Sequence, residues 1–301
     1  MIADSPRPRR TLDRWVWIDG DIRRGEDAVL SVFDRGARDG EGLLETLRIY
    51  GGEPYQWSRH LERLVVSAAE LGFPVPPSPR FLREGLAQLL VRTGLAEAAA
   101  RITVTRGIPG GGGRRARTGA WIEVEPIAAR LWRASGSGAR VVYSRQPFEP
   151  GPLGRHKTTS RLAYHLARDE ARAARADEAL LVSKDGAVLE GSVSNLFAVE
   201  AGVVRTPPLS LGILPGIARA TVLAMCADSG IDAEESRLTA RDLEQVDEIF
   251  MTNSLQEVVS VGELEGRSRV FSTAVADRLR SAYATLVAQE IERGALPPTV
   301  A

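Results

Sequence analysis

Residues 151–160 have the sequence Gly-Pro-Leu-Gly-Arg-His-Lys-Thr-Thr-Ser, and Lys157 in this stretch is one of only two lysines in a chain of 301 residues. Of the thirty-nine Lys and Arg residues, all except these two lysines are arginines. An arginine stays protonated in a protein, whereas a desolvated lysine amine can lose its proton and attack a carbonyl to form a Schiff base. A lysine retained in such a chain is therefore a candidate for that chemistry.

The two lysines lie in different surroundings. Lys184 lies in a Ser-Lys-Asp-Gly segment between two apolar runs, and Asp-Gly favours the positive φ of a hairpin turn. A solvated charge on a turn explains this lysine. Lys157 follows a Gly-Pro-Leu-Gly loop and precedes residues 162–173, whose pattern predicts a helix. Since sequence position does not show burial, Lys157 is either a charge at a helix start or a reactive amine.

Two segments further along the chain favour the reactive amine. Glu190 begins the run Glu-Gly-Ser-Val-Ser-Asn-Leu-Phe, in which small residues let the backbone approach a ligand. Residues 214–219, Leu-Pro-Gly-Ile-Ala-Arg, lead into an apolar-periodic helix that ends near Ser229, and free amides at a helix start form a phosphate site. A reactive lysine, an acid for a pyridinium nitrogen and a helix start for a phosphate are the three requirements of pyridoxal phosphate.

In this order the segments resemble the class IV aminotransferase family, the fold type IV pyridoxal-phosphate enzymes. That family includes branched-chain and D-amino acid aminotransferases and 4-amino-4-deoxychorismate lyases. The resemblance extends from about Trp15 to Val261, and upstream it includes the motifs at 34–36, 39–48 and 60–64. It implies an α+β or α/β fold of two domains, a smaller N-terminal α/β domain and a larger C-terminal pseudo-barrel domain. It also implies a cofactor in the cleft and a homodimer that completes each site.

The domain boundaries follow from the sequence pattern together with this resemblance. We expect a disordered tail over 1–13, the N-terminal domain over 14–130, a linker over 131–139 and the C-terminal domain over 140–301. The expected elements are hairpins at 14–22 and 45–57, a helix from the N-cap Ser58 to Gly72, a helix over 79–93, strands over 101–106 and 120–127, and a last helix over 272–293. The glycines at 110–113 predict a mobile loop over the active site, because their spacing matches no nucleotide fingerprint.

The resemblance also assigns roles to individual residues. Lys157 would be the Schiff-base lysine and general acid/base, Glu190 the partner of the pyridine nitrogen, and Arg63 the arginine that binds the phosphate. The other predicted cofactor contacts are Ser194, Asn195, Leu214 against the ring, Gly216, the amides of Ile217 and Ala218, and Thr252, Asn253 and Ser254. Ala218 departs from the family, because many relatives carry a threonine there, so one hydroxyl contact is expected to be missing.

The residues that border these motifs favour the lyase reaction, which converts 4-amino-4-deoxychorismate to 4-aminobenzoate and pyruvate in folate precursor synthesis. Residues 157–162 and 252–255 resemble the lyases, and the former lacks the Gly-Asn-Tyr of branched-chain aminotransferases. Pro109 and glycines replace the Arg-x-His trap of many D-amino acid aminotransferases. The pair Gln256-Glu257 argues against the lyase, because a glutamate that faced inward would be unfavourable near a pocket for a dicarboxylate. The predicted substrate residues are Leu44, Arg106, Arg161 and Leu255.

Two alternatives stay open at this point. One is an aminotransferase acting on D-amino acids, branched-chain amino acids or (R)-amines, because the specificity of the family depends on loops that one sequence cannot place. The more remote one is a non-catalytic scaffold that keeps the fold and binds a metabolite or partner. Intact Lys157, Glu190 and Arg63 argue against the scaffold.

Composition narrows the expected partners. Thirty-nine acidic residues balance the thirty-nine basic ones, which argues against unaided binding of nucleic acid. The single cysteine, Cys226, excludes an internal disulfide framework and lies on the apolar side of a predicted helix. No apolar run has the length of a membrane span, and the first residues lack the apolar core of a signal peptide. We expect a cytoplasmic enzyme with a small-molecule substrate and no metal.

Overall fold

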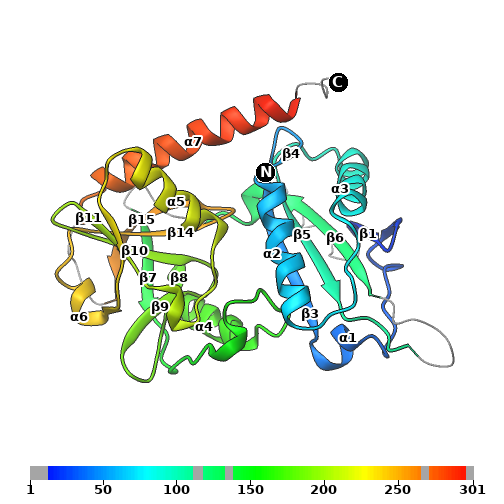
Figure 1. Ribbon diagram of the computed structural model, residues 1–301, viewed down its shortest axis with the longest axis horizontal. Helices are drawn as coiled ribbons and strands as arrows, with labels where there is room; N and C mark the ends of the chain where they lie inside the picture. Colours follow the sequence, from blue (N-terminus) through cyan, green and yellow to red (C-terminus); the bar gives the residue numbers. More distant parts are fainter. Residues whose placement is uncertain (1–12, 111–117, 133–137, 266–270, 296–301) are drawn as a thin grey trace, which may run out of the picture. The chain divides into compact units, whose positions relative to one another are not determined.

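A computed structural model describes residues 13–110, 118–132, 138–265 and 271–295. The chain forms two compact units, each with its own sheet (Figure 1). The first contains residues 1–129 and Thr158–Ser160, and the second contains residues 130–157 and those from Arg161 onward. The predicted tail up to residue 12, the glycine-rich loop beyond Gly110 and residues 133–137 of the predicted linker lie outside the described residues.

The first unit is built on a six-stranded sheet in which every strand pairs antiparallel with its neighbour. The strand order is β2-β1-β6-β5-β3-β4. The strands are β1 Trp15–Ile18, β2 Asp21–Arg24, β3 Gly42–Tyr50, β4 Glu53–Pro54, β5 Ala98–Thr105 and β6 Ala120–Pro126; the helices are α1 Arg35–Asp39, α2 Trp57–Glu70 and α3 Pro79–Thr93. Both predicted hairpins are present, and β5 begins earlier than predicted because Ala98 pairs with Ile49 of β3.

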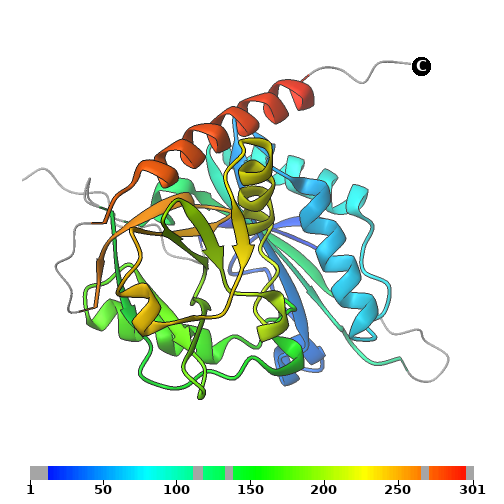
Figure 2. The same cartoon turned by 60° about the vertical axis from the view of Figure 1, so that its left-hand side comes forward.

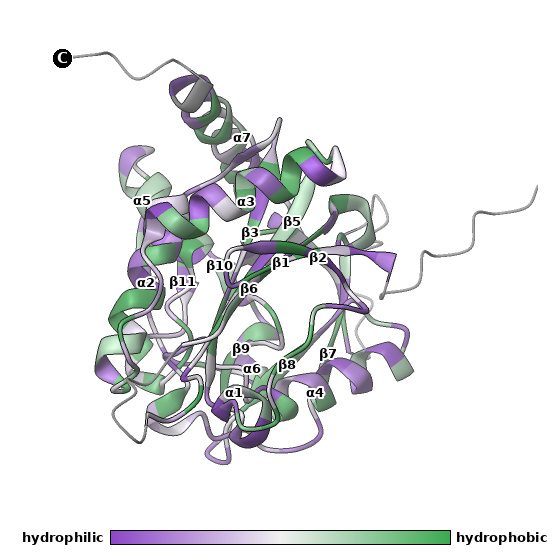
Figure 3. Cartoon of the chain, turned by 90° about the vertical axis from the view of Figure 1, so that its right-hand side faces the viewer, coloured by the Kyte–Doolittle hydropathy of each residue, from purple (hydrophilic) through white to green (hydrophobic). Residues whose placement is uncertain are grey.

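Helices α2 and α3 pack on this sheet through their apolar faces. Leu61 and Leu64 of α2 join the core that Leu86 of α3 and Trp17 of β1 also enter. A Cβ at Gly85 would lie 2.4 Å from the Trp17 ring, so this glycine lets α3 approach β1 closely. Both helices mix apolar and polar residues along their length (Figure 3), and Val66 of α2 and Val91 of α3 are exposed. Each buried leucine contributes about 1.5–3 kcal/mol to folding.

The sequence predicted the start of α3 correctly but not the start of α2. Helix α3 covers the predicted residues, and the Ser78 hydroxyl accepts a hydrogen bond from the amide of Phe81 at its N-terminus. The predicted N-cap of α2, Ser58, was wrong. Gln56 holds that position with a left-handed backbone (φ 52°), so the chain leaves β4 in a tight turn and Ser58 already lies within the first helical turn.

The second unit contains a nine-stranded mixed sheet with the order β12-β11-β10-β14-β15-β7-β8-β9-β13. The strands are β7 Ala139–Tyr143, β8 Glu178–Val182, β9 Ala187–Gly191, β10 Asn195–Glu200, β11 Val203–Thr206, β12 Ala233–Glu235, β13 Leu238–Thr239, β14 Glu248–Asn253 and β15 Glu257–Leu264. β9 and β10 are far apart in this order, yet they contact each other where the chain passes from one to the other. The sheet therefore curves strongly, as expected for a pseudo-barrel.

Helices cover this sheet on more than one side. They are α4 Leu162–Ala173, α5 Ile217–Asp228, α6 Ala240–Leu243 and α7 Ala274–Ala295. α4 packs on β8, whereas α5 and α7 pack together on the strands around β14 (Figure 2, yellow and red). Cys226 of α5 is fully buried, and burial raises the pKa of its thiol to about 11. The cysteine is therefore a core residue.

Residues Thr158–Ser160 belong to the first unit although their neighbours in sequence belong to the second. The amide of Thr159 donates to the carbonyl oxygen of Gly42 over 2.8 Å, and its hydroxyl donates to that of Gly40 over 2.9 Å. Thr158 also forms an antiparallel bridge with Leu43 of β3. The chain thus changes unit directly after Lys157, which a single boundary near residue 130 does not anticipate.

Candidate active site

The loop that carries Lys157 is held by a close backbone contact within the second unit. A Cβ at Gly154 would lie 2.1 Å from the carbonyl oxygen of Gly212, so only a glycine permits this approach. Gly212 lies just before Leu214 in the chain, and the contact therefore brings two predicted site segments together. Lys157 is partly buried, and α4 begins at Leu162, so the predicted loop-to-helix junction is present.

Glu190 is buried near the end of β9 and accepts hydrogen bonds from three directions. The backbone amide of Leu214 donates to its Oε2 over 3.2 Å, and the side-chain amide of Asn195 donates to the same oxygen over 3.3 Å. The Tyr164 hydroxyl lies 3.4 Å from Oε1. These three donors fix the orientation of the carboxylate and are all uncharged.

Burial raises the pKa of Glu190 to about 7. Arg161, the Leu214 amide and Lys157 act in the opposite direction but do not cancel the loss of hydration. The effect of the Lys157 ammonium on Glu190 places these two predicted residues in one electrostatic environment. A buried carboxylate of this kind favours a partner that brings its own positive charge, such as a protonated pyridine nitrogen.

Asn195 links the carboxylate to the segment that leads into α5. Its Nδ2 also donates to the carbonyl oxygen of Leu214 over 3.1 Å. A Cβ at Gly216 would lie 1.9 Å from Oδ1 of Asn195, so the residue at 216 must be glycine. The side chain of Asn195 is thus committed to holding Glu190 and residues 214–216 together.

The start of α5 has the properties of a phosphate site. Gly216 is the N-cap residue, and no side chain caps the helix. The first amides of a helix have no intrahelical partner, so those of Ile217 and Ala218 can donate to an anion. Thr252 pairs with Asn195 in the sheet, and its Oγ1 is buried without a hydrogen-bond partner within the described residues. An uncapped helix start and an unsatisfied buried hydroxyl fit the phosphate of pyridoxal phosphate.

Tyr164 was not predicted, and Arg161 has contacts that the sequence did not indicate. The guanidinium of Arg161 stacks on the Tyr164 ring at 3.8 Å from its centroid, and its Nη2 donates to the carbonyl oxygen of Ser192 over 3.3 Å. Burial, followed by the nearby Glu190 carboxylate, raises the pKa of Tyr164. The only sequence signal for this tyrosine was its place on the apolar face of the helix after Lys157.

The turn between β14 and β15 is closed by Asn253. Its Oδ1 accepts hydrogen bonds from the amides of Leu255 and Gln256 over 2.9 and 2.8 Å. Leu255 is buried, whereas Ser254 is partly exposed. The side chain of Gln256 binds backbone atoms of residues 130 and 132.

Arg63 lies in the first unit, where it forms a buried ion pair with Glu45. Its Nε and Nη2 donate to the two carboxylate oxygens over 2.8 and 2.6 Å, and His60 Nδ1 lies 2.7 Å from Oε2. Burial by itself would raise the pKa of Glu45, but Arg63 and His60 lower it to about 2. The phosphate contact predicted for Arg63 stays a prediction.

The two predicted substrate residues of this unit have structural contacts. Arg106 donates to the carbonyl oxygens of Leu71 and Gly72 over 2.9 and 2.6 Å at the end of α2, and its Nε lies 2.6 Å from Oε2 of Glu41. Leu44 is buried in β3. Neither the contacts of Arg106 nor the burial of Leu44 tests a role in substrate binding.

The sequence profile of the family described as "Amino-transferase class IV" matches residues 42–264. This chain belongs to that family. The matched range contains Arg63, Lys157, Glu190 and the start of α5, so the class IV aminotransferase signature covers both units. Members of the family are pyridoxal-phosphate enzymes, and pyridoxal phosphate is the cofactor of this chain.

Two relatives of this class IV aminotransferase carry different activities in their names. A putative branched-chain-amino-acid aminotransferase of Methanocaldococcus jannaschii is 32% identical over 84% of this chain and 88% of its own length. A D-alanine aminotransferase of Bacillus licheniformis is 28% identical over 84% of this chain and 89% of its own length.

Solved structures extend the comparison to the fold. A branched-chain amino acid aminotransferase of "T.th." complexed with N-(5'-phosphopyridoxyl)-L-glutamate gives a TM-score of 0.78 at 29% identity, covering 91% of this chain and 94% of that one. A putative 4-amino-4-deoxychorismate lyase of Legionella pneumophila gives 0.76 at 28% identity, covering 86% and 97%. The class IV aminotransferase fold predicted from the sequence is confirmed by these structures.

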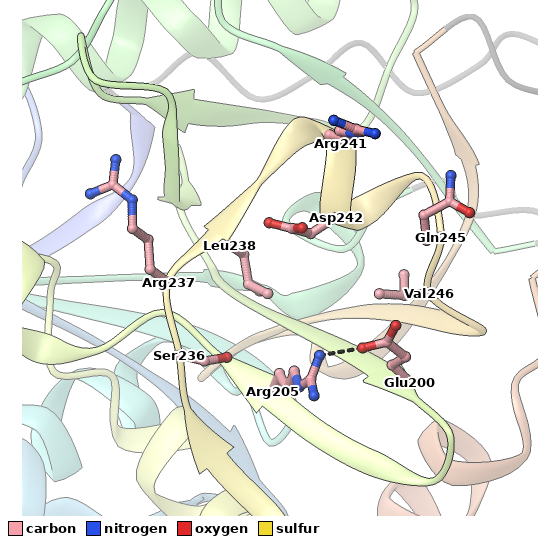
Figure 4. Close-up of a pocket in the computed structure, with 9 residues that line it drawn as sticks. All are labelled: Glu200, Arg205, Ser236, Arg237, Leu238, Arg241, Asp242, Gln245 and Val246. Carbon is pink, nitrogen blue, oxygen red and sulfur yellow. Dashed lines mark hydrogen bonds and ion pairs between the residues drawn. The ribbon is translucent and has the colours of Figure 1, made fainter.

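A separate cavity of about 270 Å³ lies beside α6 in the second unit (Figure 4). Of the charged residues that line it, Arg205 binds Glu200, and Arg237 lies 2.9 Å from Asp185 outside the lining. None of the predicted site residues lines it. The candidate active site of this class IV aminotransferase is therefore the cluster around Glu190 and not this cavity.

Across the described ranges, the helices are too short or too polar to span a membrane.

Proposed function

We propose that this chain is an amino acid aminotransferase in which Lys157 is the catalytic residue and Glu190 and the start of α5 bind pyridoxal phosphate. The observation that carries the cofactor assignment is the buried Glu190, which has a raised pKa and shares its environment with Lys157. A carboxylate this deeply buried costs free energy unless a cation completes it. The pyridine nitrogen of the cofactor supplies that cation.

Bound pyridoxal phosphate supplies a carbonyl that condenses with amines and an aromatic ring that accepts electrons. Glu190 keeps the proton on the pyridine nitrogen, while the Ile217 and Ala218 amides and the Thr252 hydroxyl bind the phosphate. Lys157 Nζ would be the group that takes up and returns the proton of the substrate α-carbon.

Relatives of this chain favour amino transfer over lysis. Both relatives described above, and one of the two structures, carry aminotransferase names. Since these names include branched-chain and D-amino acid activities, we propose an amino acid as the amino donor and leave its configuration to the experiment.

4-Amino-4-deoxychorismate lysis is the second candidate. It is favoured by the Lys-Thr-Thr-Ser-Arg-Leu sequence at 157–162 and by the Legionella structure. In that reaction Lys157 Nζ would remove a proton from the substrate ring, and expulsion of pyruvate would leave an aromatic product. The same lysine and carboxylate serve both reactions, so geometry around Glu190 does not favour one over the other.

The test is a single-turnover experiment with the purified holoenzyme. L-leucine, L-valine and D-alanine are mixed separately with the protein, and conversion of the bound cofactor to its pyridoxamine form is followed by absorbance. Conversion by an amino acid, with release of the matching keto acid and no conversion in Lys157→Ala, supports the aminotransferase. Release of equimolar 4-aminobenzoate and pyruvate from 4-amino-4-deoxychorismate, without conversion by amino acids, overturns it in favour of the lyase.

Three further parts of the proposal come from the resemblance. They are the contact of Arg63 with the phosphate, the homodimer and the cytoplasmic location. Sedimentation of the holoenzyme at several concentrations tests the homodimer. Loss of pyridoxal phosphate affinity in Arg63→Ala, with affinity for unphosphorylated pyridoxal retained, tests the contact.

A further inference from the structure

Glu178, at the start of β8, is a fully buried carboxylate that lies outside the predicted site. Its Oε1 accepts hydrogen bonds from the amides of Ala179 and Ser192 over 2.9 and 3.0 Å and from the Ser192 hydroxyl over 2.5 Å. Its Oε2 accepts from the amide of Val193 over 3.1 Å and from the hydroxyl of Ser194 over 2.7 Å. These five donors offset the loss of hydration that a buried carboxylate suffers.

The donors on residues 192–194 form the turn that joins β9 to β10. Gly191 closes this turn by donating its amide to the carbonyl oxygen of Ser194 over 2.7 Å. A Cβ at Gly191 would lie 2.2 Å from Ser194 Oγ and 2.8 Å from Glu178 Oε2, so the chain is packed directly around the carboxylate. Glu190 lies immediately before this turn and Asn195 immediately after it.

The geometry of the pyridine-nitrogen carboxylate therefore depends on this turn. Asn195 can donate to Glu190 over 3.3 Å only while the turn keeps the ends of β9 and β10 at their present separation. Arg161 adds a second support, because it donates to the carbonyl oxygen of Ser192. Arg168 of α4 interacts electrostatically with Glu178. Burial lowers the pKa of the Arg168 guanidinium, and the Glu178 carboxylate opposes that change.

We propose that Glu178 is a positioning residue for the reaction, which holds Glu190 and Asn195 in their productive geometry through the 192–194 turn. This inference rests on the proposed function of Glu190 as the partner of the pyridine nitrogen. Ser194 takes part in this positioning, since its hydroxyl donates a hydrogen bond to Glu178. The contact of Ser194 with the cofactor stays a prediction.

The same unit contains a matched control in Glu248. This glutamate is also buried, at the start of β14, and accepts hydrogen bonds from the Ser272 hydroxyl and from the amides of Val275 and Ala276. It holds the start of α7, which begins at Ala274 and not at the predicted residue 272. Its loss should weaken the fold without moving Glu190.

The experiment compares Glu178→Gln and Ser194→Ala with Glu248→Gln and Ser272→Ala. Each purified protein is titrated with pyridoxal phosphate, and the visible spectrum of the bound cofactor is recorded between pH 5 and 9. We expect Glu178→Gln and Ser194→Ala to bind pyridoxal phosphate about tenfold more weakly and to shift the pH midpoint of the spectrum, because a charged hydrogen bond of this kind is worth that factor. The Glu248 and Ser272 variants should lower the thermal unfolding midpoint while leaving the affinity and spectrum unchanged.

Wild-type affinity and spectrum in Ser194→Ala and Glu178→Gln would overturn the proposal, whatever their thermal midpoints. If Glu178→Gln does not fold, Ser194→Ala decides the question alone, because it removes a single hydroxyl. Binding and spectrum do not depend on turnover. A wild-type protein that binds the cofactor normally but transfers no amino group would therefore contradict the proposed function and still leave the role of Glu178 measurable.

Discussion

The side-chain amide of Asn195 donates to Oε2 of Glu190 over 3.3 Å, and both side chains are buried. The Tyr164 hydroxyl, the Leu214 amide and the Asn195 amide that donate to Glu190 are neutral, and Arg161 and Lys157 lower its pKa without cancelling the effect of burial. Ionisation of this carboxylate therefore costs free energy in the cofactor-free protein, and its pKa rises to about 7. Under the proposed function, the protonated pyridine nitrogen of the cofactor would offset this cost.

The first prediction follows from that charge. An acid whose pKa is higher in the folded than in the unfolded protein destabilises the fold as pH rises from its unfolded value of 4.5 toward about 7. Glu190→Gln keeps the shape and the hydrogen bonds but removes the charge. In the cofactor-free protein it should raise the thermal unfolding midpoint at pH 8 and leave it nearly unchanged at pH 4.5. An equal shift at both pH values would contradict the raised pKa.

The second prediction concerns the two lysines. Borohydride reduction of the wild-type holoenzyme should attach the cofactor to the peptide that contains Lys157, since a Schiff base is reduced to a stable amine. Lys184→Ala should give the same labelled peptide, because Lys184 lies on an exposed hairpin turn. Lys157→Ala should remain unlabelled and lose the visible absorbance. Label on Lys184, detected by peptide mass spectrometry, would reassign the reactive amine.

Local sequence signals predicted much of the fold because the features concerned are local. Ser78 and Gly94 define the ends of α3, and both caps occur as the residue types require. The order of Lys157, Glu190 and Leu214 along the chain indicated the cofactor and the segments that meet in the second unit.

What the sequence did not indicate depends on long-range packing. Tyr164 and Glu178 belong to α4 and β8, and they come close to Glu190 and its turn because α4 packs on β8 and β8 pairs with β9. Ser58 was predicted as an N-cap from its residue type, but the left-handed backbone at Gln56 starts α2 earlier. Nor does a local pattern reveal the buried carboxylate of Glu178, to which the Ser194 hydroxyl donates a hydrogen bond.

The third prediction tests the phosphate site at the start of α5. Thr252→Val removes a buried hydroxyl that has no partner within the described residues, so the cofactor-free protein should lose no stability. Affinity for pyridoxal phosphate should fall by about tenfold, because a hydrogen bond to a charged group is lost. Affinity for pyridoxal, which lacks the phosphate, should not change. Equilibrium titrations with both ligands measure the difference.

Thr206→Val is the matched control for this variant. Its hydroxyl is also buried in the second unit but donates to the carbonyl oxygen of Leu196 over 2.8 Å. Thr206→Val should therefore lower the stability by about 1 kcal/mol and bind both ligands as the wild type does. Equal losses for pyridoxal and its phosphate in Thr252→Val would mean that Thr252 does not bind the phosphate.

The last prediction concerns the buried ion pair of the first unit. Glu45→Gln leaves the Arg63 guanidinium partly buried without its carboxylate, which should destabilise the protein by about 3 kcal/mol at pH 7. The folded-state pKa of Glu45 is lowered to about 2 from 4.5, so its stabilising effect is complete above pH 4.5 and is lost as pH falls toward 2. The difference in unfolding free energy between wild type and Glu45→Gln should therefore shrink between pH 5 and 2.5, as measured by urea unfolding. Glu62→Gln, an exposed change on α2, should track the wild type across this range. A difference that stays constant with pH would show that Glu45 stabilises the fold by packing and not by its charge.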